Sequence, residues 1–277
     1  MFVGLIATQY LLLWIYDKVW EYVKALHVLS LWFVVSVLTF EAHYHIALLQ
    51  MGESMTLIGW GAVSLVFAGL FLLFGKHVDK YHKTYLGMGA GGLFLFLTLW
   101  EVRAFMVPSD FTSIGYLPLL NPIDLMQTAV LALLGYWGWQ QRRVWSKESV
   151  VQFYGVLGVL VWVLMSAIFA RYVHASQEVA YSGKALWHSD YFQTGISILW
   201  STVAIVAMLL SKAYAQRNLW LGGFGLLILV VLKLFFVELA HSGTIERIIS
   251  FIVVGTLLLL IGYFVPMPPS KVTHNER

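Results

Sequence analysis

Apolar segments long enough to cross a membrane recur along nearly the whole of this 277-residue sequence. About 20 helical residues span the hydrocarbon core of a bilayer, and here one such segment follows another with only short polar connectors between them. Their apolarity is continuous and lacks the period-two alternation of a transmembrane β-barrel. The sequence therefore predicts an all-α fold, a polytopic bundle of transmembrane helices.

The helical segments can be placed where apolarity stops and polar residues begin. We expect about nine spans, each bounded to within a few residues. They cover residues 2–16, 24–49, 54–75, 84–107, 122–140, 149–174, 190–211, 218–240 and 243–264. The first lacks a basic leading region and a small-residue cleavage site, so it is not typical of a signal peptide. Together they form one transmembrane domain, residues 1–265, followed by a polar tail, residues 266–277.

Two glycine-containing stretches suggest an internal repeat. The sequence Leu-Gly-Met-Gly at 86–89 resembles Leu-Gly-Gly-Phe-Gly at 221–225, four spans later. Spans four apart share an orientation, so a parallel repeat of four helices is allowed. Glycine near a helix start also serves ordinary close packing of helices. The sequence leaves both interpretations open.

Lysine and arginine gather in the connectors that follow the odd-numbered spans. They are Lys18, Lys24, Lys76, Lys80, Lys83, Arg142, Arg143, Lys147, Lys212, Arg217, Lys271 and Arg277. Basic connectors stay on the cytoplasmic side of a membrane. The pattern therefore predicts an outside N-terminus and an inside C-terminus with a cytoplasmic tail.

The opposite, outer ends of the helices carry acidic, histidine and arginine side chains. Ionisable groups in a span are costly, and they usually face the bundle interior or a wet cavity. We therefore treat them as a candidate outward-facing polar cluster. It comprises Glu41, His45, Glu101, Arg103, Asp124, Arg171, His174, Lys233, Glu238, His241 and Arg247.

Glu101 and Arg171 each have two interpretations. Glu101 either pairs with an arginine, of which Arg103, Arg171 and Arg247 are candidates, or contacts a substrate. Arg171 and His174 are three residues apart on one helical face, where they could clamp a phosphate or carboxylate and move a proton. Alternatively, Arg171 bonds backbone carbonyl groups of the connector 175–189.

The remaining members of the cluster also have structural interpretations. Lys233 either extends toward the membrane surface or pairs with an acid on a neighbouring helix. Glu238 and His241 share a face, and Arg247 either locks helices together or serves a site. Glu41 and His45 share a face, whereas His43 points elsewhere, so the spacing is not that of a zinc hydrolase and no metal site is expected.

The sequence Asn-Pro-Ile-Asp at 121–124 predicts a helix start on the outer face. The side chain of Asn121 can accept a hydrogen bond from an unpaired backbone N–H group. Pro122 fits the first helical position, and Asp124 places negative charge at the positive end of the helix. This turn would lie at the rim of any outward-facing site.

Several kinds of chemistry have no support in the sequence. Cysteine is absent, which excludes disulfides, thiolate metal sites and cysteine nucleophiles. The phosphate-binding glycine loop and the Gly-x-Ser-x-Gly motif are also missing, so no cofactor is expected. The basic residues are spread over several connectors, which argues against nucleic-acid binding. The expected partner is the lipid bilayer, with a lipid-linked or polar envelope molecule as a candidate ligand.

Four stretches of the chain resemble a known protein family. They are residues 116–125 (Tyr-Leu-Pro-Leu-Leu-Asn-Pro-Ile-Asp-Leu), residues 27–32 with Glu41, residues 171–174 with Gln193, Leu199 and Trp200, and residues 232–235 with Glu238, Leu239, 247–251, Gly262 and Tyr263. Together they resemble the bacterial multi-pass "predicted membrane proteins" of the domain of unknown function family 2339. Members are typically far longer, so the chain resembles their C-terminal portion. The resemblance implies a multi-pass architecture in a bacterial cytoplasmic membrane and supplies no catalytic residues.

Three functions are consistent with this pattern. The first is a non-catalytic envelope scaffold, carrier or binding protein. The second is a membrane-embedded transferase acting on a polar or lipid-linked envelope substrate, with Arg171 or Arg247 as anion clamp and His174 or Glu101 as acid or base. The third is a transporter, which would need polar residues that continue to the inner side, where the spans are nearly bare.

Overall fold

The computed structural model describes residues 8, 11, 23–49, 52–74, 85–109, 116–214, 216–238, 252, 255, 256 and 259. These residues form helices joined by turns, and none of them belongs to a β-strand. The all-α class predicted from the sequence is therefore confirmed for this part of the chain.

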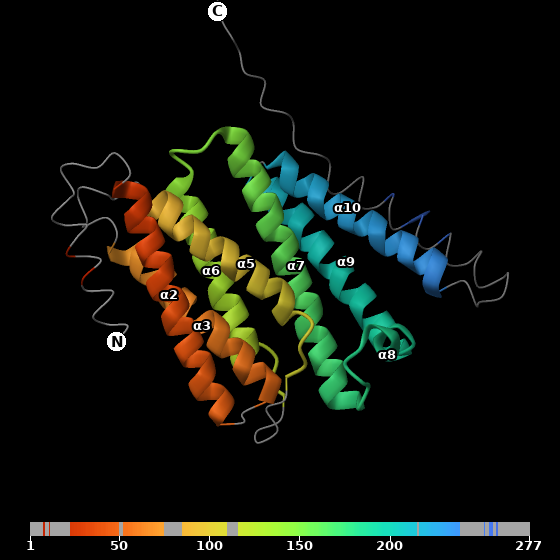
Figure 1. Ribbon diagram of the computed structural model, residues 1–277. Coiled ribbons are helices and arrows are strands. Elements are labelled where there is room, and N and C mark those ends of the chain that lie inside the picture. Colours follow the sequence, from red (N-terminus) through yellow and green to blue (C-terminus); the bar gives the residue numbers. More distant parts are fainter. Residues whose placement is uncertain are drawn as a thin grey trace, which may run out of the picture. The chain divides into compact units, whose positions relative to one another are not determined.

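The helices of the described residues follow one another along the chain, as Figure 1 shows. They are α2 (Val23–Leu48), α3 (Gly52–Phe74), the π-helical η2 (Tyr85–Gly89), α5 (Ala90–Ala104), α6 (Pro122–Gln141), α7 (Lys147–Gln177), α8 (Gly183–Trp187), α9 (Asp190–Ala213), α10 (Arg217–Lys233) and the π-helical η3 (Leu234–Glu238). Each predicted span from 24–49 through 218–240 coincides within a few residues with a described helix, when η2 is joined to α5 and η3 to α10. The predicted spans 2–16 and 243–264 lie almost entirely outside the described residues.

Within the described residues, 5 helices are long and apolar enough to cross a membrane. They are Val28–Leu48, Gly52–Leu73, Lys147–Gln177, Asp190–Ala213 and Arg217–Val237. The helix α5 has only 15 residues, and α6 has 20 but carries Asp124 and several glutamines. The protein is thus a membrane protein with several helices able to cross the bilayer.

The chain divides into two compact units, residues 1–175 and 176–277. In the first unit, α2 packs against α3, α3 packs against both α5 and α6, and α5 packs against α6. In the second unit, α9 packs along α10, and the short α8 packs against α9. Each unit therefore brings together helices that are near neighbours in the sequence.

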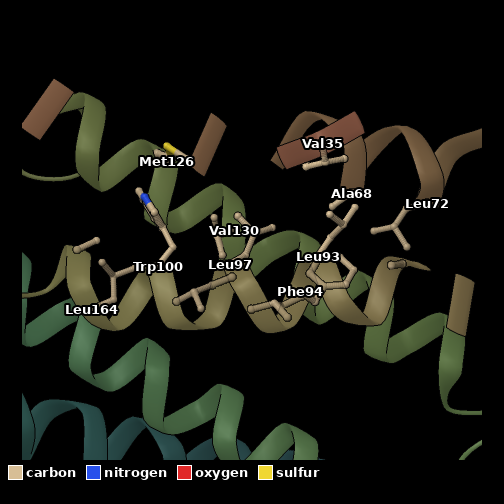
Figure 2. Close-up of a cluster of buried hydrophobic side chains, with 14 of the residues drawn as sticks. Val35, Ala68, Leu72, Leu93, Phe94, Leu97, Trp100, Met126, Val130 and Leu164 are labelled. Atoms are coloured by element: carbon tan, nitrogen blue, oxygen red, sulfur yellow. The ribbon is translucent and has the colours of Figure 1, made fainter. Parts of the chain in front are cut away.

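The core of the first unit is a continuous apolar cluster that runs along α5 (Figure 2). Leu93, Phe94 and Leu97 of α5 are buried against side chains from α2, α3, α6 and α7. Near one end of the cluster, Trp100 Nε1 donates a hydrogen bond of 2.7 Å to the Leu57 carbonyl oxygen. A Cβ added to Gly61 would lie 2.8 Å from Trp100 Cε2, so a glycine is needed for this close helix contact.

The opposite face of α5 is apolar and exposed. Leu95 and Leu99 are four residues apart and are 65% and 64% exposed. Large exposed apolar patches are rare on water-soluble proteins, whereas lipid chains solvate them without cost. This surface is therefore the one expected where a helix meets lipid.

The second unit is held by a close contact between α9 and α10. Met208 of α9 and Trp220 of α10 are buried together, and Trp220 stacks on Phe224 with 5.0 Å between ring centroids. A Cβ added to Gly223 would lie 2.8 Å from the Ala204 carbonyl oxygen. Only glycine allows the two backbones to approach this closely.

A buried polar network centred on Arg171

The first turn of α6 places Asp124. Asn121 has φ −67° and ψ 140°, and its Oδ1 atom accepts a hydrogen bond of 3.2 Å from the Ile123 backbone N–H. Pro122 occupies the first helical position, as the sequence predicts. The predicted helix start is therefore confirmed, and it brings Asp124 one residue beyond Ile123 into the interior, where its side chain is fully buried.

The last third of α7 brings Arg171 to the end of α5. Its Nη2 atom donates to the Ala104 carbonyl oxygen at 2.6 Å, and its Nε atom donates to the Val107 carbonyl oxygen at 3.2 Å. Ala104 is the last residue of α5, and the final carbonyl groups of a helix have no partner within the helix. They also form its negative end, which favours a cation. The Arg171 guanidinium thus caps α5 from another helix.

The same guanidinium binds two side chains of α6. Its Nη1 atom lies 2.6 Å from Asp124 Oδ1 and 2.8 Å from Gln127 Oε1. Arg171 and Asp124 have no exposed side-chain surface. The ion pair is therefore shielded from water, and it links α6 and α7 directly.

Gln127 extends the network from α6 to Glu101 of α5. An arginine only donates hydrogen bonds, so the Gln127 atom that faces Arg171 must be the amide oxygen. The amide nitrogen then faces Glu101, where it donates a hydrogen bond of 3.2 Å to Oε1. The orientation of the amide is thus fixed by chemistry. Glu101, Gln127, Arg171 and Asp124 form one buried chain of contacts between α5, α6 and α7.

Tyr116 closes the network at the other side of Asp124. Its hydroxyl oxygen lies 2.7 Å from Asp124 Oδ2 and 3.1 Å from the Ile168 carbonyl oxygen. A hydroxyl has one hydrogen, and the carboxylate is the stronger and closer acceptor. Both oxygens of the Asp124 carboxylate are therefore engaged, one by Arg171 and one by Tyr116.

The network occupies most of the hydrogen-bonding capacity of Arg171. An arginine has about five N–H donors. One from Nε, two from Nη1 and one from Nη2 give four that bind acceptors of the protein itself. The arrangement can join three helices and neutralise the Asp124 charge, and it points no guanidinium face toward solvent.

Comparison with known proteins gives one match. A family model described as "Predicted membrane protein (DUF2339)" matches residues 2–268. The chain belongs to this family. The family resemblance inferred from residues 116–125 and the three further stretches is thus confirmed. No curated protein and no solved structure matches the chain.

The DUF2339 chain brings only part of the predicted polar cluster together. Glu101, Asp124 and Arg171 meet in the buried network. Arg103, two residues after Glu101, instead forms an ion pair with Glu53 at the start of α3, and both side chains are about half exposed. Glu101 therefore has Gln127 as its hydrogen-bond partner, and Arg103 has a separate one.

The other cluster members of the first unit lie outside the network. Glu41 and His45 contact each other along α2, with 3.5 Å between Oε1 and Nε2, and both are exposed. His174 lies half-buried in the last turn of α7. The carbonyl groups that Arg171 bonds belong to Ala104 and Val107, and this differs from the predicted contact with the connector 175–189.

In the second unit, Lys233 joins α10 to α9. Its Nζ atom donates hydrogen bonds to the Gln193 carbonyl oxygen at 2.9 Å and to Ser197 Oγ at 2.7 Å. Both of these acceptors are neutral groups of α9, and an acidic partner for Lys233 stays a prediction. Glu238 ends η3, and the predictions for His241 and Arg247 lie outside the described residues.

Two residues of the network were not singled out from the sequence. Gln127 connects Arg171 to Glu101, and the Tyr116 hydroxyl contacts Asp124. A signal for Gln127 was present, because it lies three residues after Asp124 on the same face of an otherwise apolar helix. Such a polar pair within an apolar segment indicates a partner on another helix.

Proposed function

We propose that this DUF2339 protein is a non-catalytic membrane scaffold whose first unit is locked by the Arg171 network. The observation that carries the proposal is the state of Arg171. It is fully buried, and four of its N–H groups bind acceptors on α5, α6 and the segment that follows α5. A residue held in this way fixes the positions of helices.

The competing proposal, a transferase with Arg171 as an anion clamp, makes a different demand on this residue. A clamp offers guanidinium N–H groups to the substrate. To do so here, Arg171 would have to leave Asp124 and two carbonyl groups unpaired in a buried site. Breaking a buried ion pair costs about 3–5 kcal/mol. Substrate binding would have to offset that free energy before any chemistry began.

The proposed scaffold sits in a bacterial cytoplasmic membrane with about nine spans, an outside N-terminus and an inside C-terminus. The charge of the helix ends supports this. Basic residues lie at the proposed inner ends, where Arg142 and Arg143 follow α6 and Lys212 lies in the last turn of α9. Acidic residues lie at the proposed outer ends, with Glu53 in the first turn of α3 and Asp190 in the first turn of α9. Its partner is the lipid bilayer. A polar or lipid-linked envelope molecule would contact it at the exposed outer helix ends.

The role of Arg171 can be tested with inorganic phosphate as the probe. The full chain in detergent micelles is compared with Arg171→Met, Arg171→Lys and the exposed control Arg103→Met, with thermal unfolding as the readout. We expect Arg171→Met to lower the unfolding temperature strongly and Arg171→Lys to lower it partly, because lysine keeps the charge but loses the fork of donors. Arg103→Met should have little effect.

Phosphate should shift the unfolding temperature of all four proteins equally, at matched ionic strength. A ligand that binds the folded state stabilises it by mass action. If phosphate stabilised the wild-type chain and Arg103→Met but not Arg171→Lys, Arg171 would be an anion site. The scaffold proposal would then be rejected in favour of the binding or transferase alternative.

The proposed orientation can be tested because the chain has no cysteine. Single substitutions Glu53→Cys and Arg143→Cys place a thiol at opposite ends of the helices. A membrane-impermeant thiol reagent added outside intact cells should label Glu53→Cys and spare Arg143→Cys. The reverse labelling pattern would overturn the orientation.

A further inference from the structure

Glu101 ends the network, and one of its two carboxyl oxygens has no role in the scaffold proposal. Its side chain is fully buried. One carboxyl oxygen, Oε1, accepts a hydrogen bond from Gln127. The other, Oε2, is buried and has no hydrogen-bond partner among the described residues. Locking α5 to α6 needs the first oxygen only, so the second calls for a separate explanation.

The network also determines which oxygen could carry a proton. Gln127 presents its amide nitrogen to Glu101, because its amide oxygen must face the donating Arg171. Oε1 of Glu101 is therefore an acceptor. A proton bound to this carboxyl group must lie on Oε2, the oxygen without a partner.

Two ion pairs engage Arg171 of α7 and the only acidic side chains of α6 and α3. From α7, Arg171 is paired with Asp124 of α6. From α3, Glu53 is paired with Arg103, which lies on α5 itself. Glu101 is therefore a carboxyl group without a cation of its own.

Two further titratable groups lie at the edge of this region. His174 follows Arg171 by about one turn of α7 and is half-buried. The Tyr116 hydroxyl contacts Asp124. Neither makes a hydrogen bond to Glu101, whose contact within the network is the neutral amide of Gln127.

We propose that Glu101 is a buried proton-binding site, where Oε2 takes up a proton and releases it while Oε1 stays bonded to Gln127. A carboxylate and a proton combine to a carboxylic acid, and no other bond forms or breaks. Protonation removes the negative charge of Glu101. The formal charge of Arg171, Asp124 and Glu101 together then changes from −1 to 0. A proton can bind Oε2 although this oxygen is fully buried, because a proton needs no cavity beside it.

Proton binding would act on the contact between α5 and α6. With Glu101 ionised, the bond from Gln127 is charge-assisted, and such bonds are roughly twice as strong as neutral ones. With Glu101 protonated, the same bond is neutral. The proton therefore adjusts how firmly the scaffold holds α5, which is a property beyond the static locking proposed above.

Infrared spectroscopy of the full chain in detergent micelles tests the proposal, because a carboxylic acid and a carboxylate absorb at different frequencies. We expect the wild-type chain to show a carboxylic-acid carbonyl band that changes with pH while circular dichroism stays native. The band should be lost in Glu101→Gln and retained in Glu53→Gln, a control at an exposed, paired glutamate on a neighbouring helix. Total proton uptake over the same pH range should fall by one per chain in Glu101→Gln.

Three results would overturn the proposal. They are a wild-type chain without a pH-dependent acid band, a band that survives in Glu101→Gln, and a Glu101→Gln chain that fails to fold when the wild type folds. The last is decisive because glutamine has the shape of the protonated acid. None of these results bears on Arg171, so the scaffold proposal can stand or fall separately.

Discussion

Arg171 Nη1 and Asp124 Oδ1 lie 2.6 Å apart, and neither side chain has any exposed surface. The pair joins the first turn of α6 to the last part of α7, 47 positions away in the sequence. Desolvation of two charges is expensive, and the attraction between them offsets it only when their remaining hydrogen-bonding groups are satisfied. Here Tyr116 and the carbonyl groups of Ala104 and Val107 supply those bonds.

Removal of either partner should be strongly destabilising. We expect Arg171→Met to lower the free energy of unfolding by about 3–5 kcal/mol, because Asp124 is left buried without its cation. Asp124→Asn should have a cost of the same order, since it leaves Arg171 unneutralised. Denaturant unfolding of the full chain in mixed micelles, followed by tryptophan fluorescence, measures both.

The double variant provides the decisive comparison. Arg171→Met with Asp124→Asn should cost clearly less than the sum of the two single changes, because neither charge is then left alone. Glu53→Gln, which breaks an exposed pair, should cost at most about 1 kcal/mol. Strict additivity of the two buried changes would show that the ion pair does not hold α6 to α7.

Gln127 should matter more than a glutamine elsewhere on the same helix. Gln127→Leu removes the acceptor of one Arg171 bond and the donor of the Glu101 bond, so buried polar groups lose partners at both ends. The expected cost is about 1–3 kcal/mol for each group left unsatisfied. Gln140→Leu is the matched control, because its amide makes a single, partly buried bond of 3.3 Å to the Leu72 carbonyl oxygen. Equal losses in the two variants would show that Gln127 is not a connecting residue.

Gly223 should tolerate no side chain. In Gly223→Ala the new Cβ would lie 2.8 Å from the Ala204 carbonyl oxygen and 2.8 Å from Met208 Cγ. We expect a loss of about 1–3 kcal/mol, because α9 and α10 must move apart. Gly222→Ala is the control, since nothing lies within 4 Å of its Cβ position. Thermal unfolding should place Gly222→Ala at or above the wild type; a loss equal to that of Gly223→Ala would contradict the close contact.

Local features of this fold can be predicted from the sequence, whereas its pairings cannot. The start of α6 follows from Asn121 and Pro122, because a cap acts within one turn. The long helices follow from continuous apolar segments. The partner of Arg171 depends instead on which helices pack together. Glu101 and Asp124 both lie near helix ends and could both pair with Arg171, and nothing in the sequence indicates which of them does.

The same limit applies to the polar cluster as a whole. Placing every ionisable group of the outer helix ends in one cluster assumes that they converge. In the described residues, Arg103 pairs with Glu53 and Glu41 pairs with His45, and both pairs are exposed. A half-exposed ion pair at a helix end and a buried one inside the bundle look alike in a sequence, because the difference is the burial given by tertiary packing.

Lys233 gives a prediction that is confined to the second unit. Lys233→Met should remove the bonds from Nζ to the Gln193 carbonyl oxygen and to Ser197 Oγ, at a cost of about 1–3 kcal/mol. Both acceptors lie on α9, so hydrogen exchange of the full chain should become faster in α9 and α10 and stay unchanged in α5 and α6. Lys212→Met, at an exposed position at the end of α9, is the control and should alter neither region. Faster exchange in α5 and α6 would mean that residues 1–175 and 176–277 do not behave as the separate units into which they divide.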